Sequence, residues 1–459
     1  MKQYRTEYDS LGEKEIPIQA YYGVQTLRAY ENFKISGRKT HKEMIRAIVE
    51  IKKAAALTNA AAGVLDGEKA EAVAKACDEI LAGGYFKDFI VDAIQGGAGT
   101  SLNMNANEVI ANRAIELLGG EKGDYTIVHP NDHVNCGQST NDAYPSAGKI
   151  ALIRMLKKAI GALETFRDAL MKKSQEFKNV IKMGRTQLQD AVPVSFGQSF
   201  GAYASAVARD IARFEKAIGA LSVLNMGGTA IGTGLNADAY YLKNIVPTLC
   251  DVTGLSLTQA EDLIDATQNL DCFVYVSGIV KACATTLSKI ANDLRLMSSG
   301  PRTGFAEVNL PPKQNGSSIM PGKINPVIPE VVNQIAFRIM GNDVTVTHVA
   351  EAGQLELNAF EPIAFYALFE SLEILHNGVN TFRRDCIEGL TVNAEVCEEE
   401  VERSIGVVTA LCPHLGYARA AAIAKRALKE KRNVREILAE EEGLDEKKLG
   451  ELLNPYAMI

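Results

Sequence analysis

The sequence lacks the features expected of a membrane or secreted protein. No run of eighteen apolar residues occurs in the 459 residues, and the closest, residues 272–280, is stopped by Lys281, so a membrane span is not expected. Residues 1–7 contain no apolar core of a signal peptide. The eight cysteines are scattered without a Cys-x-x-Cys pair, as is typical of free thiols in a reducing cytoplasm. We therefore expect a cytoplasmic protein.

Signs of nucleic-acid, metal and nucleotide binding are also missing. The net charge is -7 and no basic stripe occurs, which argues against nucleic-acid binding. His41, His348, His376 and His414 show no metal-ligand spacing, and we expect none of the histidines to coordinate a catalytic metal. The glycine-rich residues 227–234 match neither a dinucleotide fingerprint nor a P-loop. We interpret them as a tight turn between helices.

The apolar periodicity is helical almost throughout. Apolar residues recur every three or four positions from Ile153 to Leu170, and a longer stripe with near-heptad spacing runs from Leu270 to Leu294. Such stripes predict long helices packed in a bundle, and bundle helices often supply subunit contacts. Strand signals are few, with residues 15–18 as one short extended piece. The pattern indicates a mainly α protein and argues against a Rossmann-type sheet.

Four separated segments contain hydroxyl and amide residues out of proportion to their surroundings. They are residues 96–105, 137–142, 184–190 and 316–326. In at least three, a turn rich in glycine or hydroxyls opens a helical stretch, where free N–H groups and the helix dipole favour an anion. Each segment alone is better explained as a capped helix start, but four together favour a small dianionic ligand. Arg185 and Lys323 supply local positive potential.

These residue types suit the removal of a proton next to a carboxylate. The resulting carbanion must spread its charge onto the carboxylate oxygens as an aci-carboxylate, which preorganised donors stabilise as an oxyanion hole does. The residues suited to these tasks are, for that carboxylate, Thr100, Ser139, Thr140 and Ser318; for a second carboxylate, Thr186, Lys323 and Asn325; for an ammonium group, Asn141; and, as proton acceptor, Ser317.

The 316–326 loop is the most informative of the four segments. It places two adjacent hydroxyls, a lysine and an asparagine between glycines and prolines. A serine removes a proton only if nearby N–H groups or a cation stabilise its alkoxide. Gly316 and Gly322 allow the backbone to turn so that N–H groups converge on one point. An ordinary polar turn followed by a helix is a poor explanation for this combination of eleven residues.

The 316–326 loop resembles the signature loop of the aspartase/fumarase superfamily. The resemblance covers nearly the whole chain, starting at residues 21–26, and is strongest to the aspartase branch. It implies a three-domain, mainly α fold with a central long-helix bundle that assembles into a tetrameric helical core. The implied domains are an N-terminal helical domain (1–141), a central bundle with the loop (142–393) and a small C-terminal helical domain (394–459).

The resemblance also implies roles for individual residues. Ser317 falls at the position of the catalytic base. The substrate-binding positions fall on Thr100, Ser139, Thr140, Asn141, Thr186, Gln187, Ser318, Lys323 and Asn325. In the superfamily each active site gathers its segments from three subunits of a homotetramer. No organic cofactor or catalytic metal is required by the mechanism, and activation by divalent cations stays open.

Gln187 bears on whether ammonia or water is lost. Fumarases have histidine there, because hydroxide is a poor leaving group and needs a proton donor. An ammonium group already has its extra proton, so the neutral amide of Gln187 is tolerable for deamination. Some aspartases also have histidine at this position, so Gln187 argues against a fumarase more firmly than it argues for an aspartase. The aspartase resemblance thus implies reversible deamination of L-aspartate to fumarate by anti-elimination. Fumarate hydratase and a non-catalytic structural homologue remain the alternatives, and His129 is interpreted as a loop residue, with a secondary anion site as the minority interpretation.

Overall fold

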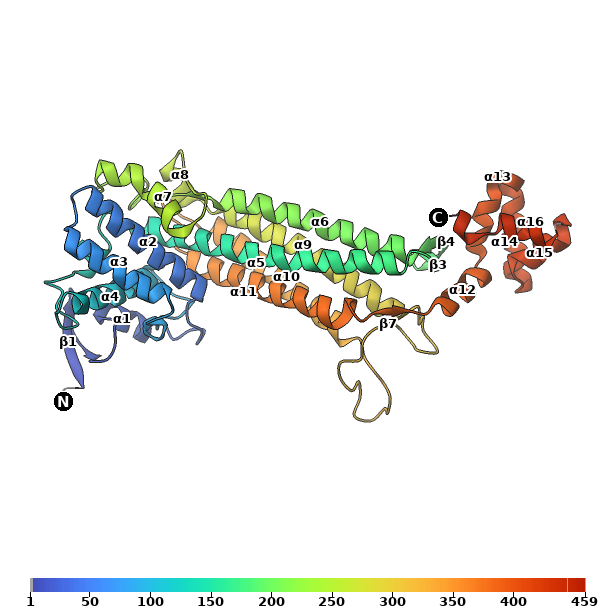
Figure 1. Ribbon diagram of the computed structural model, residues 1–459, viewed down its shortest axis with the longest axis horizontal. Helices are drawn as coiled ribbons and strands as arrows, with labels where there is room; N and C mark the ends of the chain where they lie inside the picture. The colour runs from blue at the N-terminus through green and yellow to red at the C-terminus, as the bar shows by residue number, and fades with distance from the viewer. Residues whose placement is uncertain (1–2, 444, 459) are drawn as a thin grey trace. The chain divides into compact units, whose positions relative to one another are not determined.

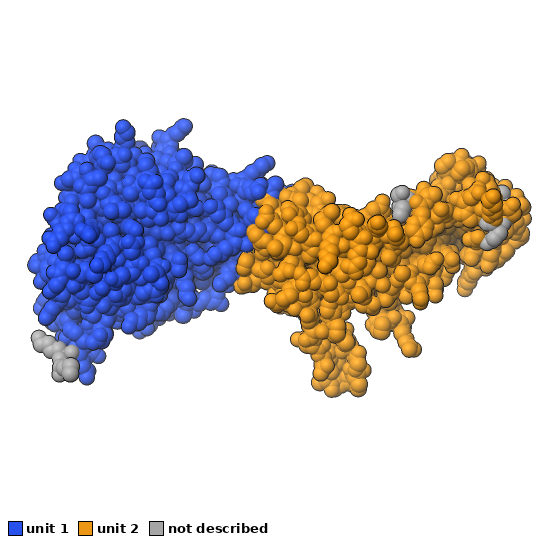
Figure 2. Space-filling model, in the orientation of Figure 1, with its two compact units in different colours: residues 1–160, 212–282, 338–374 blue, residues 161–211, 283–337, 375–459 orange. Residues whose placement is uncertain are grey.

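The structure is a computed structural model that describes residues 3–443 and 445–458. It is 63 % helical, which confirms the predicted mainly α class. The chain forms two compact units (Figure 2). Unit 1 comprises residues 1–160, 212–282 and 338–374, and unit 2 comprises residues 161–211, 283–337 and 375–459. The predicted division into three domains stays a prediction.

Five long helices supply residues to both units (Figure 1). They are α5 (Thr140–Glu176), α6 (Phe196–Leu221), α9 (Asp271–Met297), α10 (Val327–Glu351) and α11 (Glu361–Phe382). The Tyr203 hydroxyl of α6 donates to Asp293 of α9, and the Asn333 amide of α10 donates to Ser288 of α9. The two predicted apolar stripes lie on α5 and α9 and are largely buried. The predicted helix bundle is therefore confirmed.

Helix α9 is long and apolar enough to cross a membrane by length and composition. However, 56 % of its most apolar stretch is buried inside the protein. Val280, Ala284 and Leu294 are each at most 1 % exposed. We therefore assign α9 to the core of the bundle, where an apolar helix is expected.

Unit 1 contains most of the shorter N-terminal helices. Its further elements are β1 (Tyr4–Asp9), β2 (Gly12–Pro17), α1 (Val24–Asn32), α2 (Lys42–Ala61), α3 (Gly67–Leu81), η1 (Phe86–Asp88), α4 (Thr100–Leu117), η2 (Pro130–Val134), β5 (Val223–Leu224), α7 (Ala239–Thr253), β6 (Thr258–Gln259) and α8 (Leu263–Gln268). Strands β1 and β2 form an antiparallel hairpin, and β2 contains most of the predicted extended piece at residues 15–18.

Residues 21–26, where the family resemblance begins, are held in place by a carboxylate from another helix. Gly23 precedes α1 and has no capping side chain of its own. The buried carboxylate of Glu108 on α4 accepts the backbone N–H groups of Gly23, Gln25 and Thr26, together with the Thr26 hydroxyl. A carboxylate at a helix N-terminus satisfies the free N–H groups and the helix dipole. This contact fixes α1 against α4, the helix that begins at Thr100.

Unit 2 contains the C-terminal helices and two short sheets. Its further elements are β3 (Ile181–Thr186), β4 (Gln189–Ser195), β7 (Val308–Asn309), η3 (Arg383–Ile387), β8 (Thr391–Val392), α12 (Ala394–Arg403), η4 (Ile405–Leu411), α13 (Cys412–Leu415), α14 (Tyr417–Glu430), α15 (Val434–Glu442), α16 (Glu446–Leu452) and η5 (Pro455–Ala457). The antiparallel β3–β4 hairpin was not predictable from the strand pattern, because Gly184 and Pro193 interrupt it.

The C-terminal helices pack around a small core of their own. Val407, Leu411, Ile423 and Ile437 belong to one buried cluster, which also includes Met183 of β3. Helix α15 begins with a side-chain cap, in which the Asn433 side chain accepts the Glu436 N–H at 2.9 Å. Gly443 ends the same helix with a φ of 61°.

Candidate active site

The turn of residues 139–142 opens α5 with a reciprocal cap. The Ser139 hydroxyl accepts the N–H of Asn141 at 3.1 Å, and the Ser139 N–H donates to Asp142 at 2.9 Å. The second oxygen of Asp142 accepts the N–H groups of Gly227 and Thr229. Asp142 therefore links the start of α5 to the glycine-rich residues 227–234, which were predicted to form a turn. Burial raises the pKa of Asp142 to about 6, although these N–H groups and Lys52 favour its ionised form.

The Thr100 turn meets this cap. The Thr100 and Thr140 hydroxyl oxygens lie 3.5 Å apart, and the Asn103 side-chain amide donates to Thr140 Oγ1 at 3.0 Å. Gly99 precedes α4 with a φ of 92°, and a Cβ atom there would lie 2.3 Å from the Tyr144 ring. Only glycine fits that position. The structure thus brings the first two predicted segments together at the start of α4 and α5.

Asn141 is held with its acceptor oxygen uncommitted. Its side-chain nitrogen donates to the Ala230 carbonyl at 2.8 Å, so the amide oxygen stays available as an acceptor. An oxygen fixed in this way suits the predicted interaction with an ammonium group, which has only donors.

Lys52 is a residue that the sequence analysis missed. It lies on α2, is fully buried, and donates to the side-chain oxygens of Asn103, Asn135 and Gln138. A signal for it exists in the sequence, because Lys52 continues the three-and-four spacing of Ile45 and Ile48. A lysine on the buried stripe of a helix is rare unless its charge is satisfied.

The 316–326 loop is closed at its base by its own backbone. The Gly316 N–H donates to the Lys323 carbonyl at 2.9 Å, and the Asn325 side-chain amide donates to the Gly316 carbonyl at 2.9 Å. A Cβ atom on Gly316 would lie 2.4 Å from the Lys323 carbonyl oxygen, so this approach requires glycine. Asn325 therefore holds the loop together, a role that the sequence analysis did not foresee.

The Ser317 hydroxyl accepts two backbone N–H groups of its own loop. The donors are Ile319 at 3.2 Å and Met320 at 3.1 Å. Donors aimed at a hydroxyl oxygen stabilise the alkoxide more than the alcohol. Convergence of N–H groups on one point was predicted, and the structure places that point on Ser317. Ser318 and Lys323 are exposed on the same loop.

Thr186 and Gln187 lie at the turn of the β3–β4 hairpin. Gln187 and Leu188 are the two central residues of the turn, with φ values of 52° and 63°. A turn with both central residues at positive φ is the type that matches strand twist, and it is normally formed by Asn-Gly or Gly-Gly. Non-glycine residues in this conformation are strained. The Gln187 side chain is exposed at the tip of the hairpin.

Arg185 does not supply the free positive potential expected of it. Its guanidinium bonds to Glu307 at 2.6 Å and to Glu400 at 2.8 Å. The expectation was wrong because sequence spacing does not reveal partners more than a hundred residues away. Within the described part of the chain, Lys323 has no ion-pair partner. Of the two predicted cations, Lys323 is therefore the one whose charge is available to a ligand.

The predicted residues thus form three groups. Thr100, Ser139, Thr140 and Asn141 lie together in unit 1. Thr186 and Gln187 lie at the hairpin tip, and Ser317, Ser318, Lys323 and Asn325 lie on the 316–326 loop, both in unit 2. Each group presents polar groups suited to an anion.

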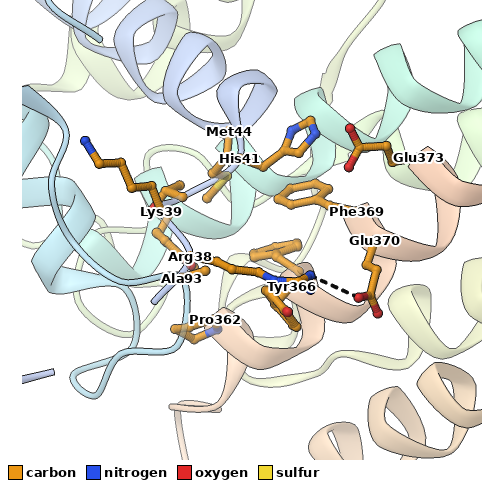
Figure 3. A pocket seen from close by; sticks show the side chains of 13 residues that line it. Arg38, Lys39, His41, Met44, Ala93, Pro362, Tyr366, Phe369, Glu370 and Glu373 are labelled. Atoms are coloured by element: carbon orange, nitrogen blue, oxygen red, sulfur yellow. Dashed lines mark hydrogen bonds and ion pairs between the residues drawn. The ribbon is translucent and has the colours of Figure 1, made fainter. Parts of the chain in front are cut away.

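A cavity of about 150 Å³ in unit 1 contains none of the predicted site residues. Figure 3 shows its lining, in which Arg38 bonds to Glu370 and His41 lies near Phe369. A second cavity, of about 390 Å³, lies among the C-terminal helices and β3, and it also contains none of them. Neither of these two cavities contains the candidate site, whose residues lie on polar turns that are half-buried or exposed.

His129 acts as a helix cap. Its Nδ1 accepts the N–H groups of Asn131 and Asp132 at the start of η2, as its interpretation as a loop residue predicted. In residues 3–443 and 445–458, no group of three or more histidine, cysteine or acidic side chains is arranged to hold a metal ion. The cofactor expectation stays a prediction.

The chain resembles known lyases over its full length. A family model described as lyase matches residues 12–341, and one described as fumarase C C-terminus matches residues 407–459. An aspartate ammonia-lyase of a Bacillus species is 52 % identical, covering 99 % of this chain and 97 % of the relative. One from Helicobacter pylori is 51 % identical, covering 99 % and 98 %.

Two solved structures share the fold. The crystal structure of fumarate lyase:delta crystallin from Brucella melitensis bound to cobalt matches with a TM-score of 0.97 and 48 % identity, covering 99 % of each chain. Recombinant class II fumarase from Schistosoma mansoni matches with a TM-score of 0.95 and 36 % identity, again covering 99 % of each chain.

Proposed function

Because the chain belongs to the lyase family that includes aspartate ammonia-lyases and class II fumarases, we propose that it converts L-aspartate reversibly to fumarate and ammonia. Identity of about half the residues along the whole chain to aspartate ammonia-lyases supports this carbon–nitrogen lyase activity. The neutral Gln187 also supports it over hydration of fumarate, because no ionisable group stands there to protonate a hydroxide.

Ser317 is the base in this proposal. Its oxygen removes the proton from the carbon next to the leaving amine's carbon. The observation that carries this role is the pair of N–H groups of Ile319 and Met320 on Ser317 Oγ. They stabilise the negative charge that the oxygen needs before it accepts the proton.

The proton removal places a second negative charge on one carboxylate, which becomes an aci-carboxylate. Hydroxyl donors aimed at its two oxygens stabilise it as an oxyanion hole does. The donors proposed for it are Thr100, Ser139, Thr140 and Ser318. Thr100 and Thr140 lie 3.5 Å apart at two helix N-termini, where the helix dipoles add to the stabilisation.

The other carboxylate binds to Lys323, with Asn325 and Thr186 as further donors. Lys323 supplies the charge, because Arg185 is neutralised by two carboxylates. Asn141 accepts from the substrate ammonium through its uncommitted oxygen. The amine leaves as ammonia on the face opposite the removed proton, which makes the reaction an anti-elimination.

The three groups of residues assemble in a homotetramer in which each active site draws on three subunits. Superfamily resemblance supports this arrangement. The chemistry requires no organic cofactor and no catalytic metal, since every charge in it has a proposed protein partner. We place the enzyme in the cytoplasm, where eight free cysteines are stable.

The proposal is tested by incubating the protein separately with L-aspartate and L-malate while following the ultraviolet absorbance of fumarate. Fumarate from aspartate is expected. Fumarate from malate alone would establish the second candidate, fumarate hydratase, which the likeness to the Schistosoma enzyme supports. No turnover of either substrate would favour a non-catalytic homologue.

A further inference from the structure

The ammonium group of Lys52 is completely satisfied by neutral amides. Its Nζ atom lies 2.6 Å from Asn103 Oδ1, 2.8 Å from Asn135 Oδ1 and 2.9 Å from Gln138 Oε1. An ammonium has three N–H donors and no acceptor, so the three oxygens match it one for one. Such a buried polar network is stable only when each member has its partner.

This match decides the orientation of Asn103. Because an ammonium can only donate, the Asn103 oxygen must face Lys52 and its nitrogen must point away. That nitrogen donates to Thr140 Oγ1 at 3.0 Å and to Asn135 Oδ1 at 3.1 Å. Reversing the amide would bring two donors together at Lys52 and leave Thr140 without this donor.

The orientation of Asn103 in turn decides what Thr140 does. Its oxygen accepts from Asn103, so its single O–H proton is directed elsewhere. The neighbouring Thr100 hydroxyl lies at 3.5 Å, the outer limit of a hydrogen bond. The Thr140 proton is therefore available to an anion at the start of α5.

We propose that Lys52 is a positioning residue, which acts through Asn103 to hold the Thr140 hydroxyl as a hydrogen-bond donor toward a bound dicarboxylate. The inference rests on the proposed function, since it assigns a purpose to Thr140 in that site. Lys52 itself is fully buried, and its Nζ donates to Asn103, Asn135 and Gln138.

Opposing effects act on the charge of Lys52. Burial lowers the pKa of Lys52 to about 7, while the charges of Asp142 and Cys77 oppose the shift. No carboxylate accepts directly from Lys52 in the described residues, so its positive charge is not cancelled by an adjacent ion pair.

The decisive variants are Lys52→Met, which removes the charge and keeps the length, and Thr140→Val, which removes the hydroxyl and keeps the shape. Lys149→Met is the matched control. Lys149 is also buried, and its Nζ donates to the Val223 carbonyl, without a link to Thr140. Asn103→Asp is the second test, because aspartate still accepts from Lys52 but cannot donate to Thr140.

The affinity for succinate, an unreactive dicarboxylate, is measured by calorimetry, and kcat/KM for L-aspartate is measured alongside. Residues that orient a ligand-binding group typically change affinity or activity 10–100-fold when replaced. Lys52→Met and Asn103→Asp are expected to weaken succinate binding about 10-fold or more, and Lys149→Met less than about 2-fold.

The double variant of Lys52→Met and Thr140→Val shows whether Lys52 acts on binding by orienting Thr140 or only by stabilising the fold. If Lys52 acts through Thr140, Lys52→Met has little further effect once the hydroxyl is gone. Equal losses in both backgrounds would overturn the inference, as would normal binding by Asn103→Asp, which also covers the case in which Lys52→Met fails to fold. Succinate binding is independent of turnover, so absence of aspartate turnover in the unmodified protein would reject the proposed function without deciding the role of Lys52.

Discussion

The guanidinium of Arg185 lies 2.6 Å from the carboxylate of Glu307, which is fully buried. This ion pair fixes β3 and the hairpin tip that presents Gln187. Lys182 also bonds to Glu307, at 3.0 Å. Glu307 is thus a buried charge held by two cations, and the loss of either leaves it undercompensated.

Replacing Arg185 with methionine is expected to lower the free energy of unfolding by about 2 kcal/mol, less than the 3–5 kcal/mol typical of a broken buried pair because Lys182 remains. Chemical denaturation measures the change. Arg403→Met is the control, since the Arg403–Glu399 pair is exposed and such pairs are worth about 0–1 kcal/mol. Equal effects of the two variants would contradict the structural role of Arg185.

Ser317→Ala is expected to lower kcat about 10²–10⁴-fold, the usual contribution of a positioned base. The free energy of unfolding should change by less than about 0.5 kcal/mol, because the loop is exposed and carries no core packing. Ser10→Ala, which removes another exposed serine, is the control for both measurements. Near-normal turnover of aspartate by Ser317→Ala would remove Ser317 from the role of base.

Lys323→Gln is expected to weaken succinate binding about 10–100-fold, because a hydrogen bond to a charged group is worth about 1.5–3 kcal/mol. Lys313→Gln is the matched control, because it also removes one lysine charge from the segment between β7 and α10. Lys313, however, is paired with Asp385 at 3.0 Å, so its replacement should leave succinate affinity nearly unchanged. Calorimetry with both variants tests whether binding needs the particular charge of Lys323.

Leu188→Gly is expected to raise the free energy of unfolding by roughly 0.5–1 kcal/mol. Leu188 is 65 % exposed with a φ of 63°, so glycine loses little packing and removes the left-handed strain of about 1–2 kcal/mol. The entropy of glycine in the unfolded chain offsets about 0.5–1 kcal/mol of this gain. Leu11→Gly is the matched control, because Leu11 is also an exposed turn leucine and is not among the positive-φ residues. Greater stabilisation by Leu11→Gly would refute the strain argument.

The stability of the protein is expected to fall with rising pH through the titration of Glu361. Burial raises the pKa of Glu361 from 4.5 to about 8, although Lys149 opposes the shift. Between these values the folded protein binds the proton more tightly than the unfolded chain, so the free energy of unfolding decreases as pH rises, by at most about 1.4 kcal/mol per pH unit.

Glu361→Gln should flatten this part of the pH profile, measured by denaturation at several pH values from about 5 to 8. Glu351→Gln, at an exposed position, should keep the slope of the unmodified protein. A profile that Glu361→Gln does not change would show that Glu361 does not titrate in this window.

The helix bundle was predictable because its signal is local. The stripes from Ile153 to Leu170 and from Leu270 to Leu294 bury one face of α5 and α9, as their spacing required. The β3–β4 hairpin was not predictable in the same way. Its pairing depends on a turn formed by Gln187 and Leu188, residues that rarely adopt positive φ.

The identities of the site residues were easier to predict than their partners. Hydroxyl- and glycine-rich turns identified Thr100 and Ser139, and the structure brings their segments together. The pairing of Arg185 with Glu307 and Glu400 depends on contacts across more than a hundred residues, which no local pattern encodes. Lys52 was missed because two adjacent lysines, Lys52 and Lys53, are also explained by an exposed helix face.

Ser317 receives its stabilising N–H groups from Ile319 and Met320, inside a loop that Gly316 and Lys323 close. The basicity of this oxygen is therefore set within the eleven residues of the 316–326 loop, and it stays the same wherever the loop lies. Displacing the segment as a rigid piece alters how far the oxygen reaches, but not how readily it takes a proton. Substitutions that change the position of the loop can therefore differ from those that change the basicity of the Ser317 oxygen.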